Sequence, residues 1–200
     1  MTKSPSSDRH RLIIEAALAC FSRHGVEATT IDMIREASGA SVGSLYHRFG
    51  NKEGIAAEVY MQGLRDFREN LEGRLAGVRN LEEAVRAVID ANIDWIVENP
   101  DWARFVFNHR MVLVQADREK AFMEETAAAT HKWWADVLAL PGAEGLAARK
   151  SPVYASVLSG PVHDYARHWL EGRRKTSPAS LREQFAAAAH AGLLAVCAVE

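Results

Sequence analysis

Apolar residues recur every three or four positions along almost the whole chain. Near the N-terminus, for example, Ile13, Ala17, Cys20 and Phe21 fall on one face of a helix with 3.6 residues per turn. No segment alternates apolar and polar residues in the way that a half-buried β-strand does. The pattern therefore predicts an all-α protein of about nine helices.

Residues that start or stop helices divide the first part of this pattern. Gly25 has the position of a stop for the first helix, and Thr30 has that of an N-cap for the second. A short helix is expected over residues 41–48. Asn51 then caps a long helix that continues to about residue 76.

The rest of the chain contains helices with equally clear starts. Asn80 caps one segment, and Pro100 opens another, because proline is favoured in the first helical turn. Two further helices are expected over about residues 117–140 and 152–171. Pro178 opens the last one.

The expected helix over residues 41–48 is unusual, because it is short and contains Gly43, a poor helix former. Leu45 and Phe49, four positions apart, can hold it against the preceding helix, and Gly39 supplies the tight turn between them. Two short helices joined in this way fit a helix-turn-helix, whose second helix enters the DNA major groove. We therefore expect a three-helix DNA-binding unit.

Many positions in this region resemble the N-terminal DNA-binding domain of the TetR family of transcriptional regulators, and the resemblance covers roughly residues 8–60. They are Ala28-Thr29-Thr30, Ile34, Ala37, Gly39, Leu45-Tyr46, Phe49 and Lys52-Glu53. The resemblance implies a helix-turn-helix domain over residues 8–53 and an effector-binding and dimerisation domain over residues 54–200. We expect residues 1–7 to form a disordered tail.

The same resemblance implies which residues contact DNA. The positions that commonly contact phosphates correspond to Thr30, Tyr46, His47 and Lys52. The positions nearest the base edges correspond to Val42, Gly43 and Ser44. Ser41 caps this helix, and we expect it to belong to the DNA-binding surface as well. Val42 can meet a thymine methyl group but cannot hydrogen-bond a guanine, so we expect apolar readout at that base step. The N-terminus of the helix that Thr30 caps suits a phosphate, because helix N-termini carry free N–H groups.

Each of these residues also has a purely structural interpretation. Thr30 can serve as a cap alone, Tyr46 can cover the small core, and Val42 can be half-buried. His47 and Arg48 can be ordinary solvated side chains. The sequence leaves these alternatives open for each residue taken singly.

Charge and composition limit the classes of function. The 200 residues are 48% hydrophobic and 25% charged, with a net charge of −2, which excludes a uniformly basic coat for nucleic acid. Residues 1–53 contain seven Lys and Arg against six Asp and Glu, whereas the remainder contains 17 against 20. No apolar run approaches a membrane span, and residues 1–10 lack a signal-peptide core, so we expect a cytoplasmic protein. Cys20 and Cys197 read as buried apolar residues rather than a disulfide or metal ligands.

Aromatic residues gather in the middle helices, where the resemblance implies an effector pocket. The candidate pocket residues are Trp95, Trp102, Phe105, His109, His131 and Trp134, with Asn92 as a further polar candidate. Aromatic residues at helical spacing also occur in ordinary cores, and this alternative stays open for each of them. We expect a mainly apolar or aromatic cavity.

One short recognition helix buries too little surface for tight and specific binding, so we expect two copies on a palindromic operator. The alanine-rich helices over about residues 152–171 and 178–199 are the expected homodimer surface. The resemblance implies a ligand-responsive repressor that a small effector releases from double-stranded DNA. A DNA-binding architectural protein without an effector is the alternative.

An enzyme is the competing class. The sequence contains no His-Glu-x-x-His, no Gly-x-Ser-x-Gly, no glycine-rich phosphate loop and no Cys/His group with metal-ligand spacing. Adjacent carboxylates such as Glu82-Glu83 point apart on a helix and read as solvated. We therefore expect no catalytic residues, no metal and no cofactor.

Overall fold

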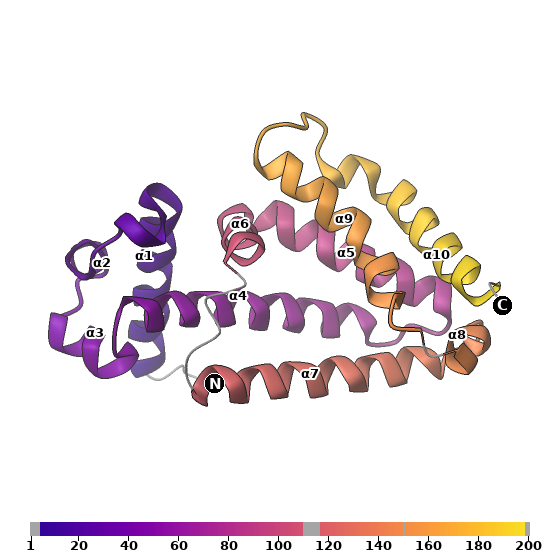
Figure 1. Cartoon of the computed structure of the whole chain (residues 1–200), viewed down its shortest axis with the longest axis horizontal. Helices are drawn as coiled ribbons and strands as arrows, with labels where there is room; N and C mark the ends of the chain where they lie inside the picture. Colours follow the sequence, from indigo (N-terminus) through magenta and orange to yellow (C-terminus); the bar gives the residue numbers. More distant parts are fainter. Residues whose placement is uncertain (1–4, 110–116, 150, 199–200) are drawn as a thin grey trace. The chain divides into compact units, whose positions relative to one another are not determined.

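The computed structural model describes residues 5–109, 117–149 and 151–198, and every regular element in these ranges is helical. Figure 1 shows their arrangement. The elements are α1 (Pro5–Ala28), α2 (Ile31–Ser38), α3 (Val42–Phe49), α4 (Lys52–Leu75), α5 (Leu81–Glu98), α6 (Pro100–Asn108), α7 (Asp117–Leu138), α8 (Glu144–Arg149), α9 (Tyr154–Leu170), the 3₁₀ helix η2 (Pro178–Leu181) and α10 (Arg182–Ala198). The prediction of an all-α fold is confirmed.

The predicted caps mark the starts of α2, α3 and α4. The side chains of Thr30, Ser41 and Asn51 each accept a hydrogen bond from the backbone N–H three residues later, at 3.2, 3.2 and 2.7 Å. Gly25 has a φ of 79° and interrupts the helical backbone within α1. Gly39 ends α2 in the left-handed region, with a φ of 66°.

The observed elements differ from the expected ones at three places. α1 begins at Pro5 rather than Asp8, and residues 1–4 of the expected tail lie outside the described residues. α8 was not expected, because six residues are too few to display a helical period. The last helix begins at Arg182, after η2, and not directly at Pro178.

The chain forms two compact units. The first unit contains the chain up to Arg65 and a second stretch that begins at Asp101 and contains α6. The second unit contains the stretch from Asp66 to Pro100 and the chain from Phe122 onward. α4 therefore begins in one unit and ends in the other. The boundary expected after residue 53 lies inside the first unit.

One continuous core joins the helices of the first unit. It consists of Ile13, Ile14, Ala17, Leu18, Phe21, Ile34, Ala40, Leu45, Phe49, Ile55, Ala56, Val59, Tyr60 and Phe105. Phe105 of α6 stacks on Phe21 of α1, with 5.6 Å between ring centroids. Gly63 of α4 lets α6 approach closely, because a Cβ atom there would lie 3.0 Å from Trp102 and Val106. α6 is thus an integral part of this core.

A buried carboxylate links three helices of the first unit. Glu58 of α4 is 2% exposed, and Arg65 donates to its Oε1 at 3.0 Å. His10 of α1 lies 3.3 Å from the same oxygen, and its ring packs 5.5 Å from that of Phe49 at the end of α3. A charge buried to this extent requires such partners. Both the start of α1 and the end of α3 are held against α4 in this way.

α5, α9 and α10 form the centre of the second unit. Arg182, at the start of α10, hydrogen-bonds both Asp90 and Asp94 of α5, and Arg74 of α4 donates to Asp94 at 2.8 Å. The hydrogen bond from Arg182 is the largest cause that holds the pKa of Asp94 below its ordinary value. These partly buried ion pairs fix the start of α10 against α5.

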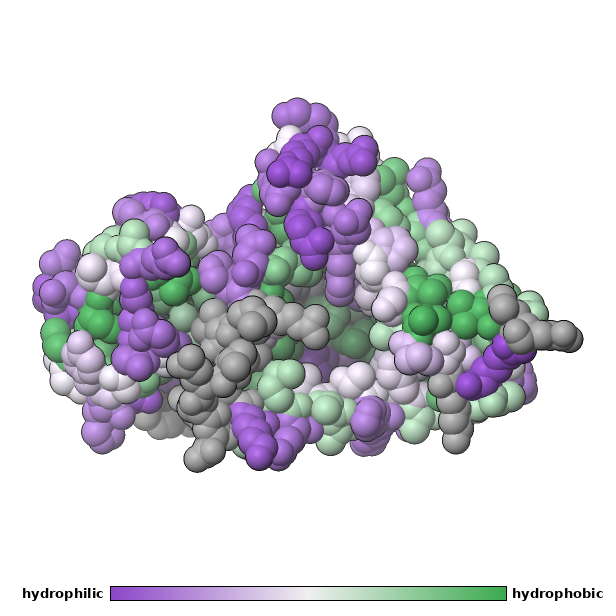
Figure 2. All heavy atoms as spheres, viewed as in Figure 1, coloured by the Kyte–Doolittle hydropathy of each residue, from purple (hydrophilic) through white to green (hydrophobic). Residues whose placement is uncertain are grey.

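The outer side of α10 carries small and apolar side chains. Its exposed residues after the first turn are Ala187, Ala188, Ala191, Leu194, Ala195 and Ala198. Figure 2 shows apolar side chains gathered on the surface near the C-terminal end of this helix. Over the part of the chain that the structure describes, no helix has the length and apolar character needed to cross a membrane.

Candidate functional site

α3 presents one face to solvent and buries the other. The exposed residues of this helix and its cap are Ser41, Val42, Gly43, Tyr46 and His47. On the opposite face, Leu45 and Phe49 belong to the core of the first unit. Every residue of α3 predicted to meet DNA thus lies on the exposed face or, for Ser44, at its border.

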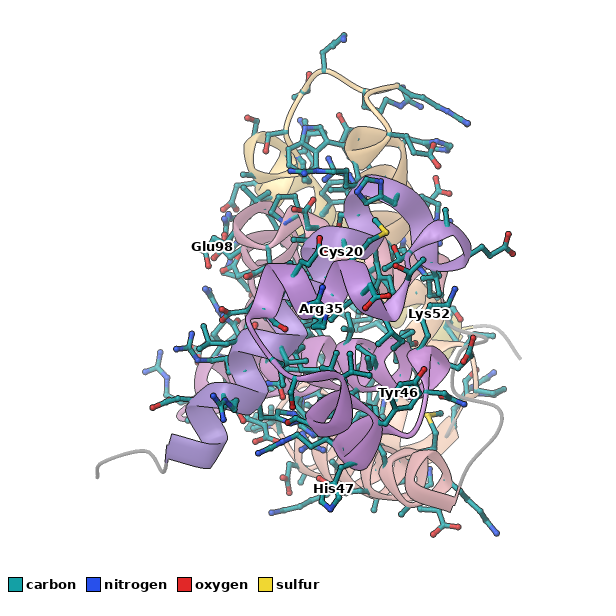
Figure 3. All side chains as sticks on the ribbon, turned by 90° about the vertical axis from the view of Figure 1, so that its left-hand side faces the viewer. Cys20, Arg35, Tyr46, His47, Lys52 and Glu98 are labelled. Carbon is teal, nitrogen blue, oxygen red and sulfur yellow. The ribbon has the colours of Figure 1, made fainter. Side chains whose placement is uncertain are left out.

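The exposed face carries one apolar and one aromatic side chain. Val42 is 38% exposed and Tyr46 is 52% exposed. About half of the Tyr46 side chain is thus open to solvent and half is packed against the protein. In Figure 3, Tyr46 and His47 project from α3 in different directions, and Lys52 lies on the same side as Tyr46.

Two glycines near α3 have opposite surroundings. A Cβ atom at Gly54, in the first turn of α4, would collide with the backbone carbonyl oxygen of Phe49 at the end of α3. A Cβ atom at Gly43 would meet nothing within 4 Å. Gly54 therefore sets the close approach of α4 to the end of α3, whereas the fold does not require Gly43. Gly54 is not among the residues predicted from the sequence, although a glycine just after a helix cap is a signal for such contact.

The N-terminus of α2 is open to solvent beside the turn after α1. The buried hydroxyl of Thr29 donates to the Gly25 carbonyl at 2.7 Å and fixes this turn. Thr30 is exposed, and its hydroxyl accepts from the backbone N–H of Met33. The cap predicted at Thr30 is confirmed, and the exposed N–H groups of the first turn suit an anion.

Lys52 ties the start of α4 to this turn. Its Nζ donates to the backbone carbonyl of Glu27 at 2.8 Å, which uses one of its three donors. Arg35 of α2, by contrast, is paired with Asp32 at 3.3 Å and Glu36 at 3.0 Å. Lys52 thus brings a less compensated cation close to α2 and α3.

The second unit contains a cavity of about 220 Å³ between α4, α5, α7 and α9. Its lining residues are Phe67, Arg68, Leu71, Glu72, Val88, Asn92, Ala129, Thr130, Trp133, Trp134, Ala155, Leu158, Ser159 and His163. A neighbouring cavity of about 460 Å³ shares Glu72, Ala129 and Trp133 with it. Among the residues for which positions are given, no group of three or more His, Cys, Asp or Glu side chains could hold a metal ion.

A hydrogen-bonded pair lies in the wall of the smaller cavity. His163 Nε2 is 2.6 Å from Asn92 Oδ1, and Asn92 Nδ2 donates to the Val88 carbonyl at 2.8 Å. Because the amide nitrogen is used by the carbonyl, Oδ1 accepts and His163 Nε2 donates. Burial lowers the pKa of His163 to about 4, with a smaller contribution from the charge of Arg167. His163 is therefore uncharged at neutral pH.

Of the six residues predicted for the effector pocket, Trp134 lines this cavity, as does the further candidate Asn92. Trp95 is buried elsewhere in the second unit, where its indole nitrogen donates to Asp66 at 2.8 Å. His131 is exposed on α7 and lines neither cavity.

The other three predicted pocket residues lie in the first unit. Phe105 belongs to its core, Trp102 packs against that core, and His109 stacks on Phe105 at 4.4 Å. Within the described residues these three side chains pack in or against an ordinary core, because α6 packs on α1 and α4. Spacing along a helix does not reveal which neighbour the helix packs against.

Comparison with known proteins places the N-terminal region in a family. Residues 13–59 match the family model described as "Bacterial regulatory proteins, tetR family". The chain is 36% identical over 87 residues to the HTH-type transcriptional regulator BetI 1 of Chromohalobacter salexigens, a match that covers 43% of each chain. The chain thus spans less than half the length of such curated relatives.

A more distant relative matches over a longer stretch. The HTH-type transcriptional repressor KstR2 of Mycolicibacterium smegmatis is 28% identical over 156 residues, which is 72% of this chain and 70% of the relative. The whole fold is similar to that of the transcriptional regulator FadR from Bacillus subtilis, solved in complex with stearoyl-CoA. The TM-score is 0.70 at 17% identity, over 91% of this chain and 98% of that one.

Proposed function

The chain belongs to the TetR family of transcriptional regulators, and from this premise we propose that it is a repressor that binds a palindromic operator as a homodimer and is released by a small ligand. The family is one of regulators and not of enzymes. The observation that carries the proposal is the exposed face of α3, where Val42 and Tyr46 remain open to solvent while Leu45 and Phe49 anchor the helix.

In the proposed complex, α3 lies in the major groove. Val42 meets a thymine methyl group, and Gly43 and Ser44 allow the helix to come close to the bases. Thr30, Tyr46, His47 and Lys52 contact phosphates on either side. The phosphate contacts fix the register of the helix, and the base contacts supply the preference for sequence.

Selection of bound duplexes from a random pool tests this proposal. The enriched duplexes should carry two related half-sites with one helical turn, or a multiple of it, between their centres. Screening compounds for release of the protein from that operator then tests for a ligand. Failure to enrich any duplex at low salt would refute the proposal, and retention on DNA against every compound would favour an architectural protein.

Replacement of Lys52 by alanine should weaken binding to all duplexes alike. The loss of one phosphate contact should reduce the slope of log affinity against log salt concentration by about 1. Titrations at several salt concentrations measure this slope. Arg35→Ala is the matched control, because Arg35 is already paired with Asp32 and Glu36. The salt slope of this variant should equal that of the unmodified protein. An unchanged slope in Lys52→Ala would place Lys52 away from the DNA backbone.

The homodimer is proposed to form through α9 and α10. The small side chains on the outer side of α10 allow close helix packing, and two such helix pairs would make a four-helix bundle.

Leu194→Arg should convert this dimer into a monomer. Leu194 is 45% exposed on α10, and a buried unpaired guanidinium would oppose association. Light scattering after size exclusion should give a mass near the chain mass of 22.1 kDa, against twice that value without the change. Leu12→Arg on α1, where Leu12 is 52% exposed, should leave the dimer intact. A dimer in Leu194→Arg would argue against this surface.

The cavity in the second unit is the proposed site of the ligand. Its lining joins α4, which begins beside α3, to α7 and α9, so a ligand there can bias the conformation of helices that bear on both proposed interfaces. The similar fold of FadR from Bacillus subtilis, in complex with stearoyl-CoA, supports the view that such a fold can hold a ligand. Release from DNA requires only that the ligand bind one conformation better than the other.

A further inference from the structure

The smaller cavity offers an apolar surface with few polar groups. Phe67, Leu71, Val88 and Leu158 line it together with the two tryptophan rings of α7, which pack edge to face at 4.5 Å. Its volume of about 220 Å³ is somewhat larger than the roughly 150 Å³ that holds a benzene molecule. A ligand of one or two fused rings with a small substituent fits this space.

Each charged group in the lining is already compensated. Arg68, the one Lys or Arg side chain among the described lining residues, donates to Glu125 at 2.9 Å and lies 3.9 Å from Glu72. His163 is neutral at physiological pH and donates to Asn92. A carboxylate or phosphate inside this smaller cavity would therefore lose its hydration without gaining an unpaired cation among the described lining residues, which is costly.

One polar atom beside the cavity still lacks a partner. The indole nitrogen of Trp133 is buried and has no acceptor among the described residues. An unsatisfied buried donor is unfavourable, so this N–H favours any acceptor that can reach it. Trp133 itself lines both cavities, so its ring lies beside the space that a ligand would occupy.

We infer that the ligand of this site is an uncharged, compact apolar molecule that carries one hydrogen-bond acceptor oxygen, which accepts from the indole N–H of Trp133. This inference rests on the proposed ligand response but goes beyond it, because it specifies the charge of the ligand and the group that recognises its oxygen. Ketones, esters and ethers of one or two rings belong to this class, whereas carboxylates and phosphates do not.

Three probes of similar size test the inference on the full-length protein: 1-indanone, indane and indane-1-carboxylate. Calorimetric titration should show that 1-indanone binds about five-fold more tightly than indane, because the ketone gains one hydrogen bond. The carboxylate should bind more weakly than both. Trp133→Phe keeps an aromatic ring but removes the donor, so it should bring the ratio of the ketone and hydrocarbon affinities close to 1. Trp134→Phe, the matched control, alters the adjacent ring and should keep the ratio.

An unchanged ratio in Trp133→Phe, tighter binding of the carboxylate, or no binding of any probe would each overturn the inference. Binding of the unliganded protein to its selected operator is measured separately. A protein that binds its operator but prefers the carboxylate overturns only the inference, whereas a protein that binds no duplex overturns the proposed function.

Discussion

Replacement of Gly54 by alanine should abolish operator binding and lower the free energy of unfolding by about 3 kcal/mol, the upper end for an overpacked site. The added methyl group would overlap the carbonyl oxygen of Phe49, which is backbone and cannot turn away as a side chain can. Either α4 or the end of α3 must move. Because Phe49 is part of the core that holds α3, a shift there also changes the orientation of the DNA-facing side.

Urea denaturation and operator titration measure the two effects of Gly54→Ala. Gly73→Ala is the matched control on the same helix, because a Cβ atom at position 73 meets nothing within 4 Å. This control should raise the free energy of unfolding by about 0.5–1 kcal/mol, the difference between alanine and glycine inside a helix. Unchanged stability and unchanged operator affinity in Gly54→Ala would show that the contact between α3 and α4 is looser than described.

Replacement of Gly43 by alanine should have opposite effects on folding and on DNA binding. The position is exposed and open, so alanine should stabilise α3 by about 0.5–1 kcal/mol. In the proposed complex, however, the methyl group would stand between the helix and the bases. Overpacking of a close interface costs about 1–3 kcal/mol, which corresponds to a loss of about five-fold to 150-fold in operator affinity.

The same two measurements test Gly43→Ala. A higher midpoint of denaturation together with weaker operator binding would indicate that the glycine serves recognition at the expense of helix stability. Gly73→Ala should match it in stability and keep full affinity for the operator. If Gly43→Ala binds the operator as tightly as the unmodified protein, then α3 does not approach the bases at this position.

Much of the N-terminal architecture could be predicted because its determinants are local. The caps at Thr30, Ser41 and Asn51 act within three residues of their own position, and the left-handed turn at Gly39 follows from its lack of a side chain. The spacing of Leu45 and Phe49 predicts which face of α3 is buried, and therefore which face is open to solvent. Each of these signals depends only on residues that are close in sequence.

Features that depend on contacts between residues far apart in the chain could not be predicted from the sequence. Trp102 and Phe105 have the spacing of any amphipathic helix, and only the packing of α6 on α1 and α4 assigns them to the core. The cavity depends on how α4, α5, α7 and α9 come together, so Trp133 and His163 could not be distinguished from other aromatic or histidine residues. Gly54 is a different case, because the residue that it contacts, Phe49, is close in sequence and its position just after the Asn51 cap is a local signal.

The place of α6 in the first unit has a consequence for the engineering of chimeric regulators. A graft that transfers only the contiguous N-terminal segment would leave behind Phe105, the aromatic partner of Phe21, and would open a void between α1 and α4. The transferred DNA-binding segment would then be less stable because of this void, whatever operator it recognises. Exchange of recognition modules between such proteins should therefore transfer two separate stretches of the gene, the second encoding α6.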